Sequence, residues 1–170
     1  EGFEIGSKSD QSSVLNVSRV HAGYGPVSSD GMPKALVLKD INFDLLPGKN
    51  LGVIGESGSG KSTLARAIAG LLPPARGIVE FFGNELRPDL RHRSKDELRR
   101  IQIVFQLADT ALNPNKPVGN ILGRPLAFYH GMKGAKRETR VDELLDMVKL
   151  PKALKHRLPS ELSGGQKQRI

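Results

Sequence analysis

Residues 55–63, with the sequence GESGSGKST, constrain the fold of this 170-residue chain more than any other stretch. They follow the apolar run at residues 51–54 and precede residues 63–72, which are rich in helix formers and end at two prolines. A loop that only turned the chain would need one or two glycines, whereas this one has three and is followed by a lysine. The pattern predicts a buried strand, a glycine-rich loop and a helix, in that order, which is the context of a phosphate-binding loop.

Each part of this loop suits the binding of phosphates. Glycines let backbone N–H groups converge on an anion without obstruction by Cβ atoms, and the helix start behind them adds a positive dipole end. Lys61 supplies a full charge for the β- and γ-phosphates, and the Ser62 hydroxyl is placed to bind Mg²⁺. The alternative is a glycine-rich strand-to-helix turn that binds nothing, and the combination of strand, loop, lysine and helix signals argues against it. The expected nucleotide-binding residues are Gly55, Glu56, Ser57, Gly58, Ser59, Gly60, Lys61, Ser62 and Thr63.

A second motif, LSGGQ, occupies residues 162–166. Ser163 is a good helix N-cap, Gln166 stands at the position that completes a capping box, and the glycines leave backbone N–H groups exposed at a helix start. Taken alone, the motif is also compatible with an ordinary helix cap. Beside a phosphate loop it predicts a second anion-binding site formed by Ser163, Gly164, Gly165 and Gln166.

Together the two motifs resemble those of the ATP-binding cassette (ABC) family, and the resemblance extends over nearly all of residues 13–170. It implies ATP and Mg²⁺ as ligands. It also implies an α/β P-loop NTPase fold, with an N-terminal antiparallel β subdomain and a helical subdomain at about residues 107–165. Residues 1–12 have the composition of a linker or tail. The resemblance further implies that the C-terminal part of the core is not contained in these 170 residues.

Two further positions match this family. Gln106 ends the segment IQIVFQ and resembles the Q-loop glutamine, which contacts Mg²⁺ or the attacking water and senses the membrane partner; it is the expected catalytic residue and, with Ser62, the expected metal ligand. Tyr24 resembles the aromatic residue that stacks on adenine. A partly buried tyrosine near the end of a strand is the alternative interpretation of Tyr24.

The resemblance is closer to one subfamily, the ATP-binding subunits that power import of dipeptides and oligopeptides, with relatives for nickel and glutathione. The matching stretches are ESGSGKSTLARAIAGLLPPARG and the ALNP at residues 111–114. One departure is that Leu107 and Ala108 replace the Asp-Pro that usually follows the Q-loop glutamine, which leaves the cargo class open. The implied function is to couple ATP binding and hydrolysis to import of peptides or similar small solutes.

The implied partners are transmembrane permease subunits, a second ABC domain whose signature motif closes over the nucleotide, and, indirectly, an extracytoplasmic solute-binding protein. The implied location is peripheral, at the cytoplasmic face of the inner membrane. The family's Asp-Glu pair and switch histidine follow the signature motif. None of the four histidines matches that switch, so we assign no general base. We therefore expect an ATPase when intact. These 170 residues alone should bind ATP weakly, if at all, and should not turn it over.

Composition limits the alternatives. The net charge of +8 is concentrated at residues 87–100 and 133–140, where no aromatic residue is interleaved with the arginines, so we expect solvated basic faces and no nucleic-acid partner. The absence of cysteine excludes disulfides and cysteine-bound zinc. Two alternative functions remain: a soluble ABC-type ATPase that acts on ribosomes or nucleic acid, and a non-hydrolysing nucleotide-binding regulator. The lack of sustained heptads between the two motifs argues against the coiled-coil chromosome type.

Periodicity predicts further elements along the chain. Alternating or continuous apolar patterns predict strands at about residues 14–24, 35–46, 51–54, 77–82 and 101–105. Helical periodicity and capping signals predict helices at residues 63–72, 94–100, 118–129 and 136–149.

Overall fold

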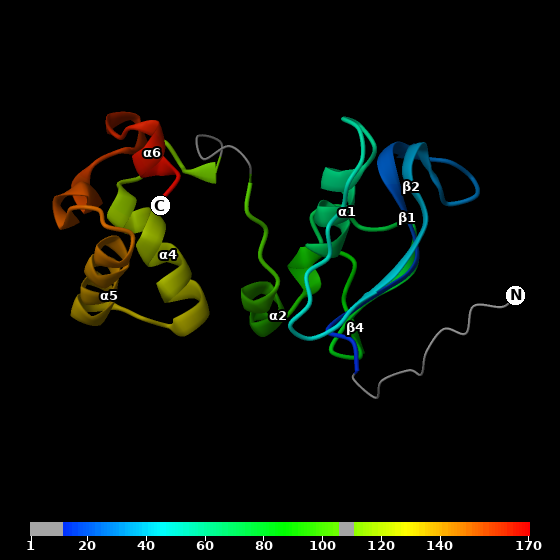
Figure 1. The fold of residues 1–170 in the computed structure, drawn as a ribbon, viewed down its shortest axis with the longest axis horizontal. Helices are drawn as coiled ribbons and strands as arrows, with labels where there is room; N and C mark the ends of the chain where they lie inside the picture. The colour runs from blue at the N-terminus through cyan, green and yellow to red at the C-terminus, as the bar shows by residue number, and fades with distance from the viewer. Residues whose placement is uncertain (1–11, 106–110) are drawn as a thin grey trace, which may run out of the picture. The chain divides into compact units, whose positions relative to one another are not determined.

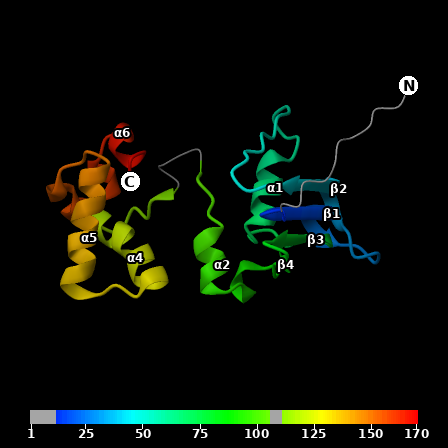
Figure 2. The same ribbon diagram turned by 60° about the horizontal axis from the view of Figure 1, so that its bottom comes forward.

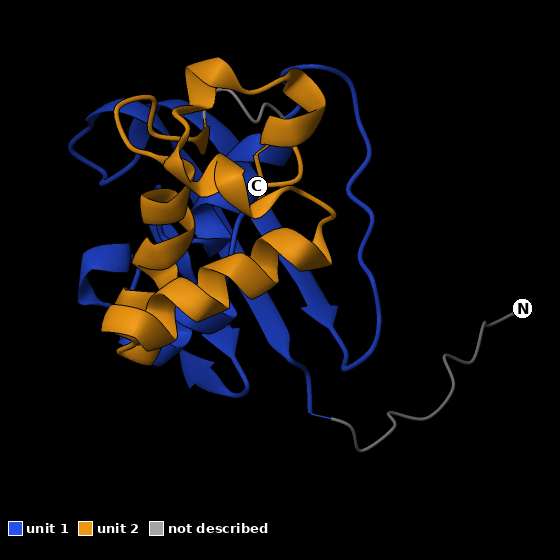
Figure 3. Cartoon of the chain, turned by 90° about the vertical axis from the view of Figure 1, so that its left-hand side faces the viewer, with its two compact units in different colours: residues 1–103 blue, residues 104–170 orange. Residues whose placement is uncertain are grey.

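The computed structural model describes residues 12–105 and 111–170 (Figure 1). The chain divides into two compact units, residues 1–103 and residues 104–170 (Figure 3). The first unit contains a sheet and two short α-helices, and the second is helical.

The sheet of the first unit has four antiparallel strands in the order β2-β1-β3-β4. Figure 2 shows β2, β1 and β3 side by side, with α1 beside them. Val17 in the central strand pairs with Phe43 on one side and Val79 on the other. The predicted strands at residues 14–24, 35–46 and 77–82 are confirmed. The strands are β1 (Leu15–Val27), β2 (Pro33–Leu45), β3 (Arg76–Phe81) and β4 (Asn84–Glu85).

The core of the first unit lies on one face of this sheet. Val17 and Val20 are both buried although they are three residues apart, because the register shifts between them and Arg19 takes a positive φ of 51°. Such a bulge inserts one extra residue and turns the following side chain back to the same face. Leu64 of α1 packs against these valines, so α1 is held to the sheet by apolar contacts.

Two helices of this unit begin where the sequence predicts. Helix α1 (Lys61–Ile68) starts directly after the glycine-rich loop but ends four residues before the predicted position, because Gly70 adopts a left-handed φ of 76°. Helix α2 (Lys95–Arg100) begins with the predicted capping box. The short 3-10 helix η1 (Leu90–His92) precedes it.

The predicted strands at residues 51–54 and 101–105 are wrong. Both segments are irregular, and most of their apolar side chains are exposed, with Ile54 at 95% and Val104 at 94%. Ile101, by contrast, packs against the core of the first unit. A strand forms only where a neighbouring backbone accepts and donates its hydrogen bonds. In the part of the chain that the structure describes, all the paired strands belong to the antiparallel sheet, and neither segment pairs with it.

The second unit is built on two helices, α4 (Val118–His130) and α5 (Gly134–Met147), at the places the sequence predicts. Its buried core comprises Val118, Leu126, Val141, Leu145, Leu150 and Leu162. The chain continues through η2 (Lys152–His156), η3 (Pro159–Glu161) and α6 (Gly164–Lys167). None of the helices in the described residues combines the length and the apolar character needed to cross a membrane.

Candidate functional site

The glycine-rich loop turns tightly between residue 55 and the start of α1. Gly60 is the N-cap of α1 with a left-handed φ of 97°, and a Cβ there would lie 3.1 Å from a methyl carbon of Val37. A Cβ on Gly55 would lie 2.7 Å from the Ser59 hydroxyl oxygen. The positive φ values of Gly55 (155°) and Gly60 (97°) favour glycine at both ends of the loop, and residues 55–59 are exposed to solvent.

Lys61 folds back over this loop. Its ammonium group donates hydrogen bonds to the carbonyl oxygens of Gly55 (2.8 Å) and Glu56 (2.6 Å), and lies 3.4 Å from the Ser59 hydroxyl oxygen. The cation is thus held at the mouth of the loop by neutral acceptors and not by a carboxylate. Among the described residues no carboxylate is paired with this ammonium group, so an anion that entered the loop would meet a cation held only by neutral oxygens.

The start of α1 adds to this positive potential. Its N-cap, Gly60, has no side chain to cap the first N–H groups, and the first turn of the helix contains no acidic residue. Ser62 is exposed beside Lys61, whereas Thr63 is 6% exposed. The loop and the helix start together present backbone N–H groups, an ammonium group and an exposed hydroxyl, which is a donor set suited to phosphate oxygens.

Tyr24 lies next to this helix. Its hydroxyl oxygen is 3.3 Å from the Thr63 hydroxyl oxygen and accepts a hydrogen bond from the Arg66 guanidinium at 3.2 Å. The hydrogen bond with Thr63, and then that from Arg66, lowers the pKa of Tyr24 below its ordinary value. The structure therefore brings the expected base-stacking residue to the expected phosphate-binding helix.

The sequence interpretation missed Arg66. A signal was present, because positions 63 and 66 are three residues apart on one helix and so lie on the same face. What the sequence did not show is that this face is turned toward Tyr24, 42 residues earlier in the chain.

The LSGGQ motif lies in the second unit and forms the start of α6. Ser163 and Gln166 make the predicted reciprocal capping box: the Ser163 N–H donates to the Gln166 side chain at 2.9 Å, and the Gln166 N–H donates to the Ser163 hydroxyl at 3.3 Å. Gly164 and Gly165 are exposed, and nothing lies within 4 Å of where a Cβ would be. The capping box leaves the backbone of these two glycines accessible.

Arg169 anchors this motif to the end of α5. Its guanidinium donates to the Gly165 carbonyl oxygen at 3.1 Å and to the carbonyl oxygens of Val148 and Lys149 at 3.3 Å each. The short helix is therefore tied to a longer one by a side chain that only donates. Gln106, the remaining expected site residue, lies outside the described residues, as do Leu107 and Ala108.

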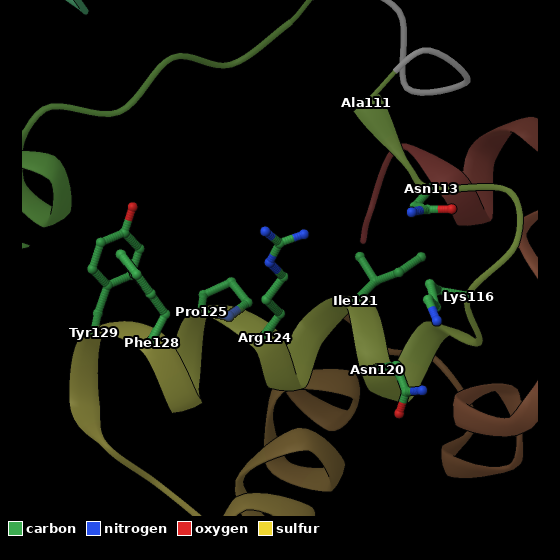
Figure 4. A pocket seen from close by; sticks show the side chains of 9 residues that line it. All are labelled: Ala111, Asn113, Lys116, Asn120, Ile121, Arg124, Pro125, Phe128 and Tyr129. Atoms are coloured by element: carbon green, nitrogen blue, oxygen red, sulfur yellow. The ribbon is translucent and has the colours of Figure 1, made fainter. Parts of the chain in front are cut away.

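A pocket of about 520 Å³ runs along α4 in the second unit (Figure 4). Arg124 and Ile121 rise from α4 into the same space, and the aromatic residues Phe128 and Tyr129 lie at one end. Lys116 lies at the other end. The pocket therefore combines an apolar floor with positive charge, and none of the described residues that line it is acidic.

Comparison with known proteins agrees with these motifs. The family model described as ABC transporter matches residues 38–170. The chain is 43% identical over 131 residues to a putative peptide import ATP-binding protein of Brucella abortus, an alignment that covers 76% of this chain and 39% of that protein. It is 37% identical over 158 residues to the nickel import ATP-binding protein of Brucella suis, with 93% of this chain and 59% of that protein covered.

The fold agrees with a solved ABC structure as well. A dimeric ATP-binding cassette in a post-hydrolysis state, bound to ADP and phosphate, superposes with a TM-score of 0.68 at 29% identity and covers 91% of this chain and 66% of that one. The fold is therefore that of an α/β ABC nucleotide-binding domain. The chain spans between about two fifths and three fifths of the length of the two curated relatives. It belongs to the ABC transporter family.

Proposed function

We propose that this chain is the ATP-binding part of an ABC importer, in which ATP binding and hydrolysis drive uptake of peptides or similar small solutes through membrane subunits. The main support for this proposal is the position of the Lys61 ammonium group. It is hydrogen-bonded to the carbonyl oxygens of the exposed loop that precedes α1. Two of its relatives are named for peptide and nickel import, which supports the class of cargo.

Each site residue has a role in this proposal. Lys61 would exchange its bonds to the loop carbonyls for bonds to the β- and γ-phosphates, and the loop N–H groups would bind the remaining phosphate oxygens. The ring of Tyr24 would stack on the adenine. Ser62 and Gln106 are oxygen ligands of the kind that Mg²⁺ accepts together with phosphate oxygens, and a bound Mg²⁺ would neutralise phosphate charge. The exposed Ser62 hydroxyl beside Lys61 fits that role.

The remaining site would come from a second cassette. Its Ser163, Gly164, Gly165 and Gln166 would close over the nucleotide bound at the first loop, so hydrolysis requires a pair of cassettes. We further propose that the protein is peripheral at the cytoplasmic face of the inner membrane, with permease subunits as direct partners and a solute-binding protein as an indirect one.

Replacement of Lys61 tests nucleotide binding directly. We expect Lys61→Ala to weaken binding of ATP by roughly ten- to hundredfold in a calorimetric titration, because it removes charge-assisted hydrogen bonds to the phosphates. Lys49→Ala removes an exposed lysine before the loop and should leave the affinity unchanged. Equal ATP affinity in wild type and Lys61→Ala would contradict the proposal, provided that the variant melts at the wild-type temperature.

The pocket along α4 is the surface that we propose for the membrane subunit. Its positive charge and apolar floor suit an amphipathic helical segment that carries an acidic residue. In the full-length protein co-expressed with its membrane subunits, we expect Arg124→Glu to reduce co-purification of those subunits. Lys136→Glu makes the same change of charge at an exposed position of α5 outside the pocket, and should not reduce it. Similar losses in both variants would contradict this assignment.

The basic segments do not favour the nucleic-acid alternative. Within residues 87–100, Arg91 pairs with Asp89 and Arg99 pairs with Asp96, so part of the positive charge is neutralised locally. The Arg100 guanidinium lies 4.5 Å from the centre of the Phe82 ring. It therefore covers one face of this ring, which is no longer available to stack on a base. These contacts support solvated basic faces at this part of the surface.

A further inference from the structure

We infer that Arg66 is a positioning residue for recognition of the base: it fixes the ring of Tyr24 against the phosphate-loop helix, so that the site prefers a nucleotide to a bare polyphosphate. This inference rests on the proposed function, because it assumes that phosphates bind at residues 55–63. It adds a residue, Arg66, that the motifs of the sequence do not assign.

The hydrogen-bond directions in this contact follow from the chemistry of the groups. A guanidinium group only donates, so the Tyr24 oxygen accepts from Arg66 at 3.2 Å. The phenolic hydrogen is then free to point at the Thr63 hydroxyl oxygen, 3.3 Å away. Thr63 and Arg66 lie three residues apart on α1, so both fixed points belong to the helix that begins at the phosphate loop.

The backbone beneath Tyr24 is already fixed, which leaves the ring torsions as the remaining freedom. Tyr24 pairs with Ala35 of β2. At the preceding residue, Gly23, a Cβ would lie only 2.1 Å from the Ala35 carbonyl oxygen, so the two strands approach very closely there. The bonds from Arg66 and Thr63 therefore act on the side chain and determine where the ring points.

These contacts suit a binding platform better than a structural support. Arg66 is exposed and Tyr24 is 40% exposed, so the hydrogen bond between them adds little to folding stability because water can replace it. An ordered aromatic ring that still faces solvent, beside a loop suited to phosphates, is placed to stack on a planar base.

The test compares ATP with inorganic tripolyphosphate in calorimetric titrations of the full-length protein. We expect Arg66→Ala to weaken ATP binding by roughly five- to tenfold, because the variant loses part of the binding free energy of the base–aromatic stack. Binding of tripolyphosphate should change by less than about twofold. Arg66→Lys should recover part of the ATP affinity. The control Arg87→Ala removes an exposed arginine elsewhere in the first unit and should change neither affinity.

A double-mutant cycle separates positioning from simple charge attraction. Tyr24→Phe keeps the ring but removes the oxygen that Arg66 contacts, so it should match Arg66→Ala, and the double variant should be no weaker than either single variant. If Arg66→Ala weakens tripolyphosphate as much as ATP, Arg66 acts on the phosphates and the inference is wrong. If neither affinity changes, the contact is only structural and the inference is again wrong.

A spectroscopic measurement checks the contact without any ligand. The chain contains two tyrosines and no tryptophan, so in a Tyr129→Phe background the phenolate absorbance reports Tyr24 alone. Arg66→Ala should raise the pKa of Tyr24 toward its ordinary value, and an unchanged titration would contradict the contact. Failure of the wild type to bind either ATP or tripolyphosphate would overturn the proposed function together with this inference. Failure of the base preference alone would leave the proposed function intact.

Discussion

Arg93 shows how a single buried cation holds the first unit together. Its side chain is buried, with 7% of the residue exposed, and it donates to the carbonyl oxygens of Arg87 (2.8 Å) and Ile68 (2.7 Å). Burial lowers the pKa of Arg93 from its ordinary value, but a guanidinium group keeps its charge in proteins. Because Ile68 ends α1, this side chain ties the far end of the phosphate-loop helix to the chain that follows the sheet.

Removing this side chain should destabilise the protein. We expect Arg93→Ala to lower the free energy of unfolding, measured in urea, by about 1–3 kcal/mol for each carbonyl oxygen that loses its donor in the interior. Arg91→Ala is the matched control, because the Arg91 side chain is 78% exposed and pairs with nearby Asp89. It should change stability by less than about 0.5 kcal/mol. A comparable loss in both variants would show that charge, and not burial, explains the effect.

At the scale of elements, signals that lie within a few residues of one another predicted the structure well. The capping boxes of Ser94 with Glu97 and of Ser163 with Gln166 start their helices as the spacing predicts. The alternating strands β1, β2 and β3 also form, because alternation specifies which face is buried. All the residues that form such a signal lie within one segment. The structure of that segment can therefore be predicted without knowing what the rest of the chain does.

The predictions that were wrong, or that the sequence did not contain, depend on distant parts of the chain. Residues 51–54 and 101–105 are largely apolar. An apolar run indicates burial, but it does not identify which other segment would pair with it as a neighbouring strand. The Tyr24–Arg66 contact joins positions 42 apart and follows from the packing of α1 on the sheet. By contrast, the turn at residues 55–60 and the helix start at Lys61 lie next to each other in the chain, and the sequence predicted both; that this loop binds phosphate stays a prediction.

At the scale of the whole molecule, each compact unit has a buried cluster of its own. Val17, Val20 and Leu64 belong to the cluster of the first unit, where α1 packs on the sheet. Leu145 and Val141 belong to that of the second unit and are both fully buried. Cooperative unfolding follows contiguous packed clusters. Loss of packing in one cluster should therefore lower the stability of the elements that contribute to that cluster before it affects the others.

Hydrogen exchange can test this division. We expect Leu145→Ala to lower the stability of the second unit by roughly 2–5 kcal/mol, since it leaves a cavity between α4 and α5, and to speed exchange of their amides. Amides of β1, β2 and β3 should keep wild-type exchange rates. The reciprocal variant, Val20→Ala, removes two buried carbons from the other cluster and should speed exchange in the sheet and α1 while sparing α4 and α5. If either substitution speeds exchange equally in both units, the two clusters unfold as one cooperative core. The phosphate loop and the signature motif would then share their stability even though they belong to different units.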